Sequence, residues 1–267
     1  MSQPASQMGY ASPATAADAT RLFKGASDPK FIAGGQSLLP TIRLGLAAPS
    51  DLIDLHSIGD LAVIKAGGNT LSIGAMTTHA TVAESADVQR MIPALAYLAG
   101  HIGDRQVRNR GTIGGSLANS DPAACYPAAV LALGATINTD KRKIAADDYF
   151  KGLFTTALEE GEIITSVDFP VPEKAAYLKF RNPASHFALV GVFVAKTAKG
   201  ARVAVTGAGA CAFRVKAMED ALSSNFSADA IKNVRVPSKD LNRDLHATPE
   251  YRAQLINVLA RRAVAAA

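Results

Sequence analysis

The sequence FIAGGQSLLP, residues 31–40, places two glycines between a short apolar run and a second apolar segment of helical character. Glycines lack a Cβ, so backbone amides can turn toward a phosphate that approaches closely. A helix that begins beside them adds the positive end of its dipole. The segment therefore predicts an anion site suited to a pyrophosphate, with Ser37 donating its hydroxyl or capping the helix. The alternative is a tight strand-to-helix turn without a ligand.

A second glycine-rich segment, RNRGTIGGSLANSDP, occupies residues 108–122. It combines three glycines with hydroxyl side chains, and we interpret the whole stretch from Gly103 to Asp121 as a loop. Its amides and hydroxyls suit phosphate and sugar oxygens, and Asp121 either accepts from sugar hydroxyls or caps a helix that begins at Pro122. Neither segment has the G-x-G-x-x-G spacing of the Rossmann fold or the lysine of a P-loop. The sequence therefore predicts a dinucleotide-binding site in a fold that is neither of these two.

The bulk composition favours a globular protein of two domains. The chain has 267 residues, more than one domain usually holds, with 48% hydrophobic and 19% charged residues. No apolar run is long enough to span a membrane. Residues 1–12 show neither the basic flank nor the apolar core of a signal peptide, so we expect a cytoplasmic location.

Cysteines and charge exclude several classes of site. The chain has two cysteines, Cys125 and Cys211, in no C-x-x-C arrangement, so neither an iron–sulfur cluster nor a zinc site is predicted, and two reduced thiols are favoured over a disulfide. The formal net charge is +5. The basic residues are dispersed and no aromatic residues are interleaved with them, so we do not expect nucleic-acid binding. An acidic small molecule or an acidic protein partner explains the charge better.

In the N-terminal half, turn and cap signals divide the chain into short elements. Ser12-Pro13 predicts the start of a helix that ends at Gly25, and Gly67-Gly68-Asn69 predicts a hairpin turn. Helices are predicted from Thr78, over Met91–Ala99 and from Pro122 to Leu133. The strands expected here are 30–33, 52–55, 61–66, 70–75, 135–138, 144–146 and 163–169.

After Pro170 and Pro172, the best candidate for a domain boundary, three strands precede three helices, an order typical of an α+β domain. The strands are predicted at 176–180, 187–195 and 202–207. The helices are predicted around Met218, after Ser227 and from Thr248-Pro249. The last helix aligns Tyr251, Leu255, Val258 and Leu259.

The two glycine segments, in this order, resemble the FAD motifs of the medium subunits of molybdenum hydroxylases, the family of xanthine and carbon monoxide dehydrogenases. The matching stretches are residues 33–40 and 112–118, and residues 73–79 match a third family segment. The resemblance covers nearly the whole chain. It implies an α+β fold with a two-subdomain FAD-binding domain of the vanillyl-alcohol-oxidase (PCMH) type. A domain like that of carbon monoxide dehydrogenase flavoproteins, with a three-stranded antiparallel sheet and helices, would follow.

The implied boundaries are 1–172 for the FAD-binding domain, with subdomains of about 1–56 and 57–172, and 173–267 for the C-terminal domain. The resemblance also implies the parts of the cofactor that the residues would contact. Ile102 falls at the adenine, Asp121 at the ribityl chain, and Ile164 and Lys179 at the isoalloxazine ring, although an ordinary solvated lysine is the alternative for Lys179. The full implied set is Ile32, Ala33, Gly34, Gly35, Gln36, Ser37, Leu38, Thr77, Ile102, Thr112, Gly114, Gly115, Ser116, Asp121, Ile164 and Lys179.

Two positions depart from the family pattern. Related sequences carry an acid near the position of Cys125 and an aspartate near that of His186. We expect Cys125 to pack in its helix and His186 to be a neutral imidazole held in the structure, or a pH-sensitive group near the flavin.

The function implied by the resemblance is electron transfer through non-covalently bound FAD. The molybdenum cofactor and two 2Fe–2S clusters would lie on a large and a small partner subunit, in a dimer of heterotrimers, and the electrons would leave through an external acceptor. The chain itself would hold no metal and no general acid or base. One alternative is a stand-alone FAD-dependent oxidase or dehydrogenase of the vanillyl-alcohol-oxidase type, and a second is a scaffold subunit without flavin.

Overall fold

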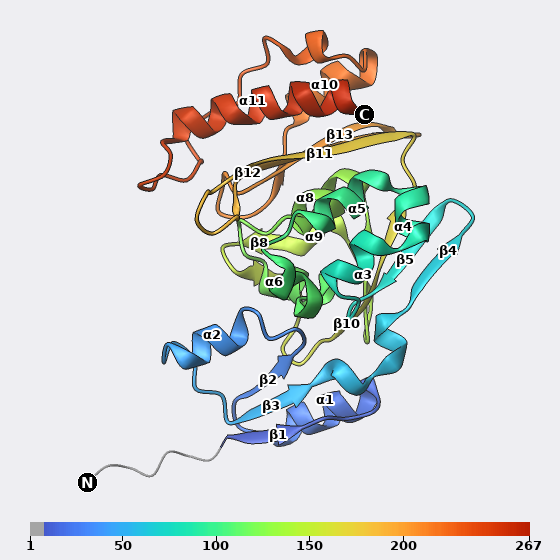
Figure 1. The fold of residues 1–267 in the computed structure, drawn as a ribbon, viewed down its shortest axis with the longest axis vertical. Helices are drawn as coiled ribbons and strands as arrows, with labels where there is room; N and C mark the ends of the chain where they lie inside the picture. The colour runs from blue at the N-terminus through green and yellow to red at the C-terminus, as the bar shows by residue number, and fades with distance from the viewer. Residues whose placement is uncertain (1–7) are drawn as a thin grey trace.

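The computed structural model describes residues 8–267, which form a mixed α+β fold (Figure 1). Met1–Gln7, part of the segment without signal-peptide features, lie outside the described residues. Three sheets follow one another from the N-terminal to the C-terminal end of the molecule, and a two-stranded hairpin stands beside the middle one. Within residues 8–267 no helix combines the length and the apolar character that crossing a bilayer requires.

The N-terminal sheet is parallel, with strand order β1-β3-β2. Its strands are β1 (Gly9–Ala11), β2 (Pro29–Ile32) and β3 (Asp51–Asp54). Helix α1 (Ala16–Gly25) covers it, and the short helix α2 (Leu38–Arg43) follows β2. The hydroxyl of Thr15 accepts from the amide of Asp18 and caps α1, so the prediction of a cap at Ser12-Pro13 was wrong by three residues.

The middle sheet is antiparallel, with strand order β4-β5-β10-β6-β7. Gly68 takes φ +54° in the turn between β4 and β5, as the hairpin prediction requires. Its strands are β4 (Ile64–Gly67), β5 (Thr70–Gly74), β6 (Thr136–Thr139), β7 (Lys143–Ala145) and β10 (Ile164–Pro170). Nearby lie η1 (Leu55–Ser57), η2 (Gly59–Ala62), α9 (Ala146–Tyr149), β8 (Phe150–Gly152) and β9 (Thr155–Thr156).

Six helices pack around this sheet, and three predictions about them need correction. Helix α3 starts after its Thr78 cap as predicted, but the helix predicted at 91–99 begins only at Pro93, because Met91 ends the preceding helix. The predicted loop from Gly103 to Asp121 holds two further helices, and the helix predicted from Pro122 begins only at Tyr126. The six are α3 (His79–Glu84), α4 (Ala86–Met91), α5 (Pro93–Gly100), α6 (Arg105–Arg110), α7 (Ile113–Asn119) and α8 (Tyr126–Leu133).

The missed helices carry cap signals. Asp104 accepts from the amide of Val107 at 2.8 Å and caps α6, and Thr112 accepts from Gly115 at 3.1 Å and caps α7. Glycine is a weak helix former, so Gly114 and Gly115 favoured a loop in the sequence. Packing overrides that preference. The start of the helix lies so close to Ala75 that a Cβ on Gly114 would be 2.7 Å from the carbonyl oxygen of Ala75, which leaves no room for a side chain.

The C-terminal sheet has strand order β11-β12-β13-β14, and β11 and β12 are long and antiparallel. The three predicted strands are present, and the two-residue β14 adds a fourth. The prediction of a three-stranded sheet was therefore wrong by one strand. That strand is too short to show an alternating pattern. The elements are β11 (Lys174–Arg181), β12 (Ala188–Thr197), β13 (Gly200–Thr206), β14 (Phe213–Arg214), α10 (Lys216–Ser224), η3 (Ala228–Ile231) and α11 (Pro249–Ala266).

Alternation along β12 connects two hydrophobic cores. Val192 and Val194 belong to the C-terminal core, which α10 and α11 cover, whereas Phe193 and Ala195 belong to the large middle core with α5 and α8. Successive side chains of a strand point to opposite faces, so the C-terminal sheet is buried on both sides. The middle and C-terminal parts of the chain are therefore packed together through apolar surface.

Candidate functional site

The first glycine segment presents a row of unpaired backbone amides. Strand β2 ends at Ile32 and α2 begins at Leu38. Within residues 8–267, none of the five amides from Gly34 to Leu38 donates to a protein group. Successive backbone amides without a protein partner can form a concave nest for an anion. The structure therefore supports the anion-site interpretation of residues 31–40 over that of a plain turn.

The two glycines of this segment are required for different reasons. Gly35 has φ +72°, a left-handed conformation that side chains rarely adopt. Gly34 touches the second glycine segment: a Cβ there would overlap the carbonyl oxygen of Arg110 and lie 2.7 Å from the Cα of Gly111. The absence of a side chain at Gly34 thus brings the two segments into direct backbone contact.

The second glycine segment offers a smooth wall and hydroxyl groups rather than amide donors. The amides of Ile113 and Gly114 donate to the carbonyls of Thr77 and Ala75, and those of Gly115 and Ser116 donate to Thr112. These four amides are therefore already satisfied. What remains available to a ligand is the Cβ-free surface of the two glycines and the hydroxyl of Ser116. The prediction that the amides of this segment bind phosphate or sugar oxygens therefore needs correction.

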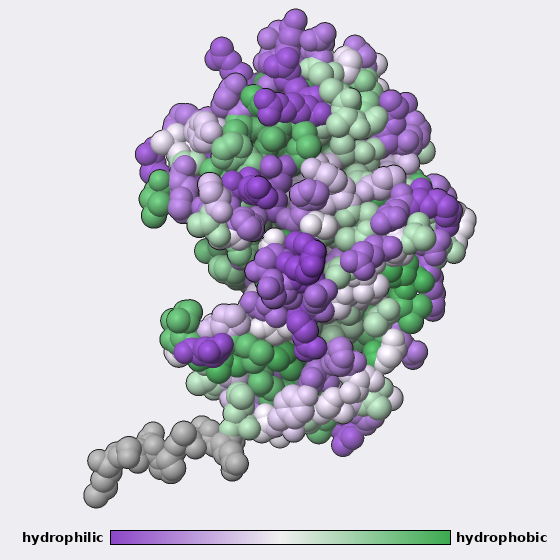
Figure 2. All heavy atoms as spheres, viewed as in Figure 1, coloured by the Kyte–Doolittle hydropathy of each residue, from purple (hydrophilic) through white to green (hydrophobic). Residues whose placement is uncertain are grey.

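The two segments line one cavity of about 700 Å³ between the N-terminal sheet and the rest of the molecule. Figure 2 shows the molecule hollowed between the lobe that carries α2 and the part above it. Cofactor and ligand cavities typically measure about 300–1,000 Å³. The sequence-predicted residues that line it are Ile32, Ala33, Gly34, Gly35, Gln36, Ser37, Leu38, Ile102, Thr112, Gly114, Gly115, Ser116, Asp121, Ile164 and Lys179.

Thr77 is the predicted site residue that does not line the cavity. It is 2% exposed, and its hydroxyl has no hydrogen-bond partner among residues 8–267. Its carbonyl accepts from the amide of Ile113 at 3.1 Å, which places it behind the start of α7. The structure therefore gives Thr77 a place in the wall that supports the site, and cofactor contact by this residue stays a prediction.

Asp121 and Cys125 lie in the turn that leads into α8. One carboxylate oxygen of Asp121 accepts from the amide of Ala123 at 2.8 Å, so the side chain stabilises this turn and does not cap a helix starting at Pro122. Its other oxygen has no partner within the described chain. Cys125 is a free thiol that lines the cavity, rather than only packing in its helix.

Lys179 is held in place rather than free in solvent. Its ammonium donates to the carbonyls of His101 at 2.7 Å and His186 at 3.0 Å and lies 3.5 Å from the sulfur of Cys125. The charge reaches the cavity from β11, with partners just after the end of α5 and in the β11–β12 loop. His186 has φ +60°, and its backbone carbonyl fixes Lys179. The solvated-lysine alternative is therefore wrong for this position.

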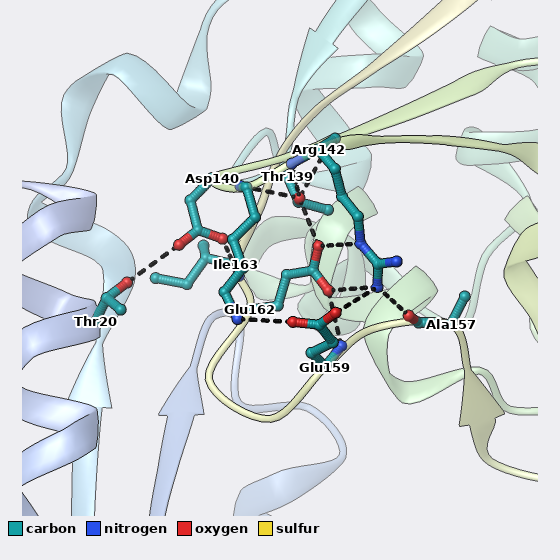
Figure 3. A network of polar contacts seen from close by, with 9 residues as sticks. Thr20, Thr139, Asp140, Arg142, Ala157, Glu159, Glu162 and Ile163 are labelled. Carbon is teal, nitrogen blue, oxygen red and sulfur yellow. Dashed lines mark hydrogen bonds and ion pairs between the residues drawn. The ribbon is translucent and has the colours of Figure 1, made fainter.

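A charged network fixes the segment that enters the cavity just before β10 (Figure 3). Glu162 is 5% exposed and accepts from Arg142 at 3.0 Å, Thr139 at 2.7 Å and the amide of Glu159 at 2.7 Å. These hydrogen bonds, led by that of Arg142, lower the pKa of Glu162 to about 2. The carboxylate therefore remains ionised in the fold and holds Ile164 at the cavity wall.

Asp140 extends this network to the N-terminal sheet. It accepts from the amide of Ile163 at 2.8 Å and from the hydroxyl of Thr20 in α1 at 3.3 Å. Figure 3 shows these contacts reaching from α1 to the strand that enters the cavity. The basic turn at residues 140–143 thus links the two sides of the cavity, a role that its composition does not reveal.

His79 is a buried cavity residue. In the sequence it stands out only as the last residue of segment 73–79, which matches the family pattern. It is 5% exposed, stacks obliquely on Tyr126 with ring centroids 5.3 Å apart, and its Nδ1 has no partner among the described residues. Burial lowers its pKa to about 4, and the nearby Arg108 guanidinium adds to the effect. The imidazole is therefore neutral near pH 7.

We expect His79 to make the fold sensitive to mild acid. The unfolded chain takes up a proton near pH 6.5 and the folded chain only near pH 4. Stability is therefore full above pH 6.5 and falls by about 3 kcal/mol as the pH drops to 4. Urea unfolding at pH 7, 5.5 and 4 measures this slope. His79→Gln should flatten it, and an unchanged slope in the variant would contradict the assignment.

Several lining residues were missed because their signal is spatial. Glu162 stands in an ordinary strand-entry sequence, and only the fold pairs it with Arg142. Other cavity residues lie at or near helix caps and in loops, and their spacing in the sequence shows no distinctive pattern. Besides His79 and Glu162, the missed residues include Lys30, Thr41, Met76, Asp104, Val107, Asn119, Leu158, Ser185 and Phe187.

Comparisons with known proteins identify the family. A model described as the FAD binding domain in molybdopterin dehydrogenase matches residues 6–172, the part of the chain that contains both glycine segments. The chain therefore belongs to the FAD-binding medium subunits of the molybdenum hydroxylase family. FAD is the cofactor of this class, and the free amides, the Cβ-free wall and the cavity volume fit a dinucleotide.

Individual relatives cover nearly the whole chain. The nicotine 6-hydroxylase medium subunit of Paenarthrobacter nicotinovorans is 38% identical, with 96% of this chain and 95% of that protein aligned. The glyceraldehyde dehydrogenase medium chain of Sulfolobus acidocaldarius is 32% identical, over 92% of this chain and 93% of its own length. The crystal structure of quinoline 2-oxidoreductase from Pseudomonas putida 86 superimposes with a TM-score of 0.88 at 29% identity, covering 100% of this chain and 98% of that chain.

Proposed function

We propose that this chain is the FAD-carrying electron-transfer subunit of a heterotrimeric molybdenum-containing hydroxylase or dehydrogenase. The observation that carries the proposal is the row of five unpaired amides from Gly34 to Leu38 on the wall of a 700 Å³ cavity. Bound FAD would supply the redox chemistry, accepting electrons from 2Fe–2S clusters of a small partner subunit and delivering them to an external acceptor. Substrate oxidation would take place on a large subunit with the molybdenum cofactor.

The protein's own part is to bind and orient the cofactor. The amides of Gly34–Leu38 would hold the pyrophosphate, with the hydroxyls of Ser37 and Ser116 beside it. Ile102 would contact the adenine, and the free oxygen of Asp121 would accept from the ribityl chain. The remaining contacts from the resemblance, those of Ile32, Ala33, Thr112, Gly114 and Gly115, would close the wall around these groups.

At the flavin end, Ile164 would pack against the isoalloxazine ring and Lys179 would stabilise negative charge. The lysine suits this role because its three neighbours are two carbonyls and a thiol, so within residues 8–267 no carboxylate pairs with its charge. Its hydrogen bonds also fix the ammonium, so little reorganisation accompanies a change of charge in the cavity. We assign no general acid or base to the chain for this function.

The domain division follows the sheets. We propose that residues 1–172 form an FAD-binding domain of the vanillyl-alcohol-oxidase (PCMH) type, with subdomains of about 1–56 and 57–172, and that 173–267 form the C-terminal domain. The parallel β1-β3-β2 sheet and the antiparallel sheet around β10 support the first division. The separate sheet of β11–β14 with its own core supports the second.

The subunit names of the relatives, "medium subunit" and "medium chain", support large and small partners for this chain as well. We propose a dimer of such heterotrimers in the cytoplasm, with neither nucleic acid nor a membrane span involved. The described residues contain no cluster of histidine, cysteine or carboxylate side chains that could hold a metal. Any metal centre of the complex would therefore be sought on the partners.

Visible spectroscopy tests the proposal against its two alternatives. The chain is purified alone and together with the products of neighbouring genes. We expect flavin bands from the chain alone, cluster bands only from the complex, and no substrate turnover by the chain alone. Turnover by the isolated chain would favour a stand-alone oxidase, and a complex without flavin bands would favour a scaffold subunit.

A further inference from the structure

A second cavity of about 550 Å³ adjoins the flavin cavity on the other side of Lys179. It lies between α5, the start of α6 and β11. Gly103, Asp104, Lys179 and His186 line both cavities, so a single layer of residues separates them. A ligand in the second cavity would therefore lie against the same ammonium group that faces the first.

The second cavity carries an excess of uncompensated positive charge. Arg108, Lys179 and Arg181 line it, and among the described residues its lining holds one carboxylate, that of Asp104. Within residues 8–267, none of the three cations forms an ion pair with a carboxylate. Asp104 is already used as the cap of α6. Three cations against one carboxylate suit a dianion, and a phosphate group has a charge close to that at pH 7.

A buried hydroxyl adds a neutral donor to this charge. Tyr177 lines the cavity, is 2% exposed, and its Oη has no hydrogen-bond partner among the described residues. An unpaired buried hydroxyl costs free energy unless a ligand or water satisfies it. Tyr177, Lys179 and Arg181 alternate along β11, so they project from one face of the strand. All three residues therefore line the same cavity, with an ammonium and a guanidinium beside the buried tyrosine.

We propose that the second cavity binds a phosphate-bearing small molecule. The Arg181 guanidinium, which has no hydrogen-bond partner within the described chain, is its main ligand, and Lys179 and Tyr177 also contact it. Arginine favours such a role because its planar N–H groups match phosphate oxygens. The occupant would offset the Lys179 charge that faces the flavin cavity, and this coupling, unlike the binding itself, rests on the proposed function.

Calorimetric titration with inorganic phosphate tests the binding. On the full-length chain we expect saturable binding at about millimolar concentration, weaker binding of acetate at equal ionic strength, and at least about fivefold weaker phosphate binding in Arg181→Gln. Arg235→Gln is the matched control, because Arg235 is exposed and forms no ion pair within the described residues. Equal affinity in all three proteins, or no saturation by phosphate, would overturn the proposal.

The coupling is read separately from the flavin. In the FAD-loaded wild-type chain, phosphate should shift the flavin midpoint potential to more negative values, because it offsets a nearby positive charge. Arg181→Gln should remove the shift and Arg235→Gln should retain it. Phosphate binding without any shift would overturn the coupling alone. A chain that binds phosphate but retains no FAD would contradict the proposed function and leave the second cavity established.

Discussion

Gly34→Ala is expected to deprive the chain of its bound FAD. The added Cβ overlaps the carbonyl oxygen of Arg110 and lies 2.7 Å from the Cα of Gly111 and 2.8 Å from the carbonyl carbon of Arg110. These are backbone atoms, so no side chain can rotate away. Relief requires the first glycine segment to move off the second, and that movement displaces the free amides of Gly34–Leu38. Overpacking of this kind costs about 1–3 kcal/mol, which corresponds to about 5- to 150-fold weaker FAD binding.

The measurement is the flavin-to-protein absorbance ratio after gel filtration, followed by fluorescence titration of the apoprotein with FAD. Gly59→Ala is the control, because nothing lies within 4 Å of the added Cβ and its φ is not left-handed. Circular dichroism and the melting temperature show whether Gly34→Ala still folds. A folded Gly34→Ala protein that retains FAD in the wild-type ratio would disprove the role of this backbone contact.

The glycine segments also show what the sequence could and could not predict. Residues 31–40 have a local signal, a strand followed by glycines and a helix start, and the structure places them as that signal predicts. For residues 112–116 the same glycines favoured a loop, whereas contact with Ala75 stabilises a helix. Local pattern therefore located both segments, but tertiary contact decided which one keeps its amides free.

Charged residues show a second limit of prediction from the sequence. Lys179 has the sequence context of a solvated strand lysine, and two of its three neighbours, His101 and Cys125, come from distant parts of the chain. The same holds for Arg142 and Glu162, which are separated by a helix and a hairpin. Sequence periodicity reports which face of an element is apolar, but it does not report which charges meet across elements. Pairing of this kind follows only from the fold.

Glu162→Gln is expected to lower the free energy of unfolding by about 2–4 kcal/mol. The carboxylate accepts from Arg142, Thr139 and the amide of Glu159, and an amide side chain has a single acceptor oxygen. The substitution therefore leaves buried donors without a partner, and the amide's own N–H groups face them. Because Ile163 and Ile164 follow directly in the chain, FAD binding should weaken as well. Urea unfolding at pH 7 gives the first quantity and FAD titration the second.

The pH dependence separates this effect from general destabilisation. The pKa of Glu162 is about 2 in the fold and 4.5 when unperturbed. A lowered pKa contributes stability that is present above pH 4.5 and is lost as the pH falls toward 2. Glu162→Gln should abolish the loss in this window while leaving the His79 window between pH 6.5 and 4 unchanged. Glu159→Gln is the control: its side chain is 59% exposed, so its ion pairs contribute at most about 1 kcal/mol. If both variants lose equal stability, the buried carboxylate does not hold this side of the cavity.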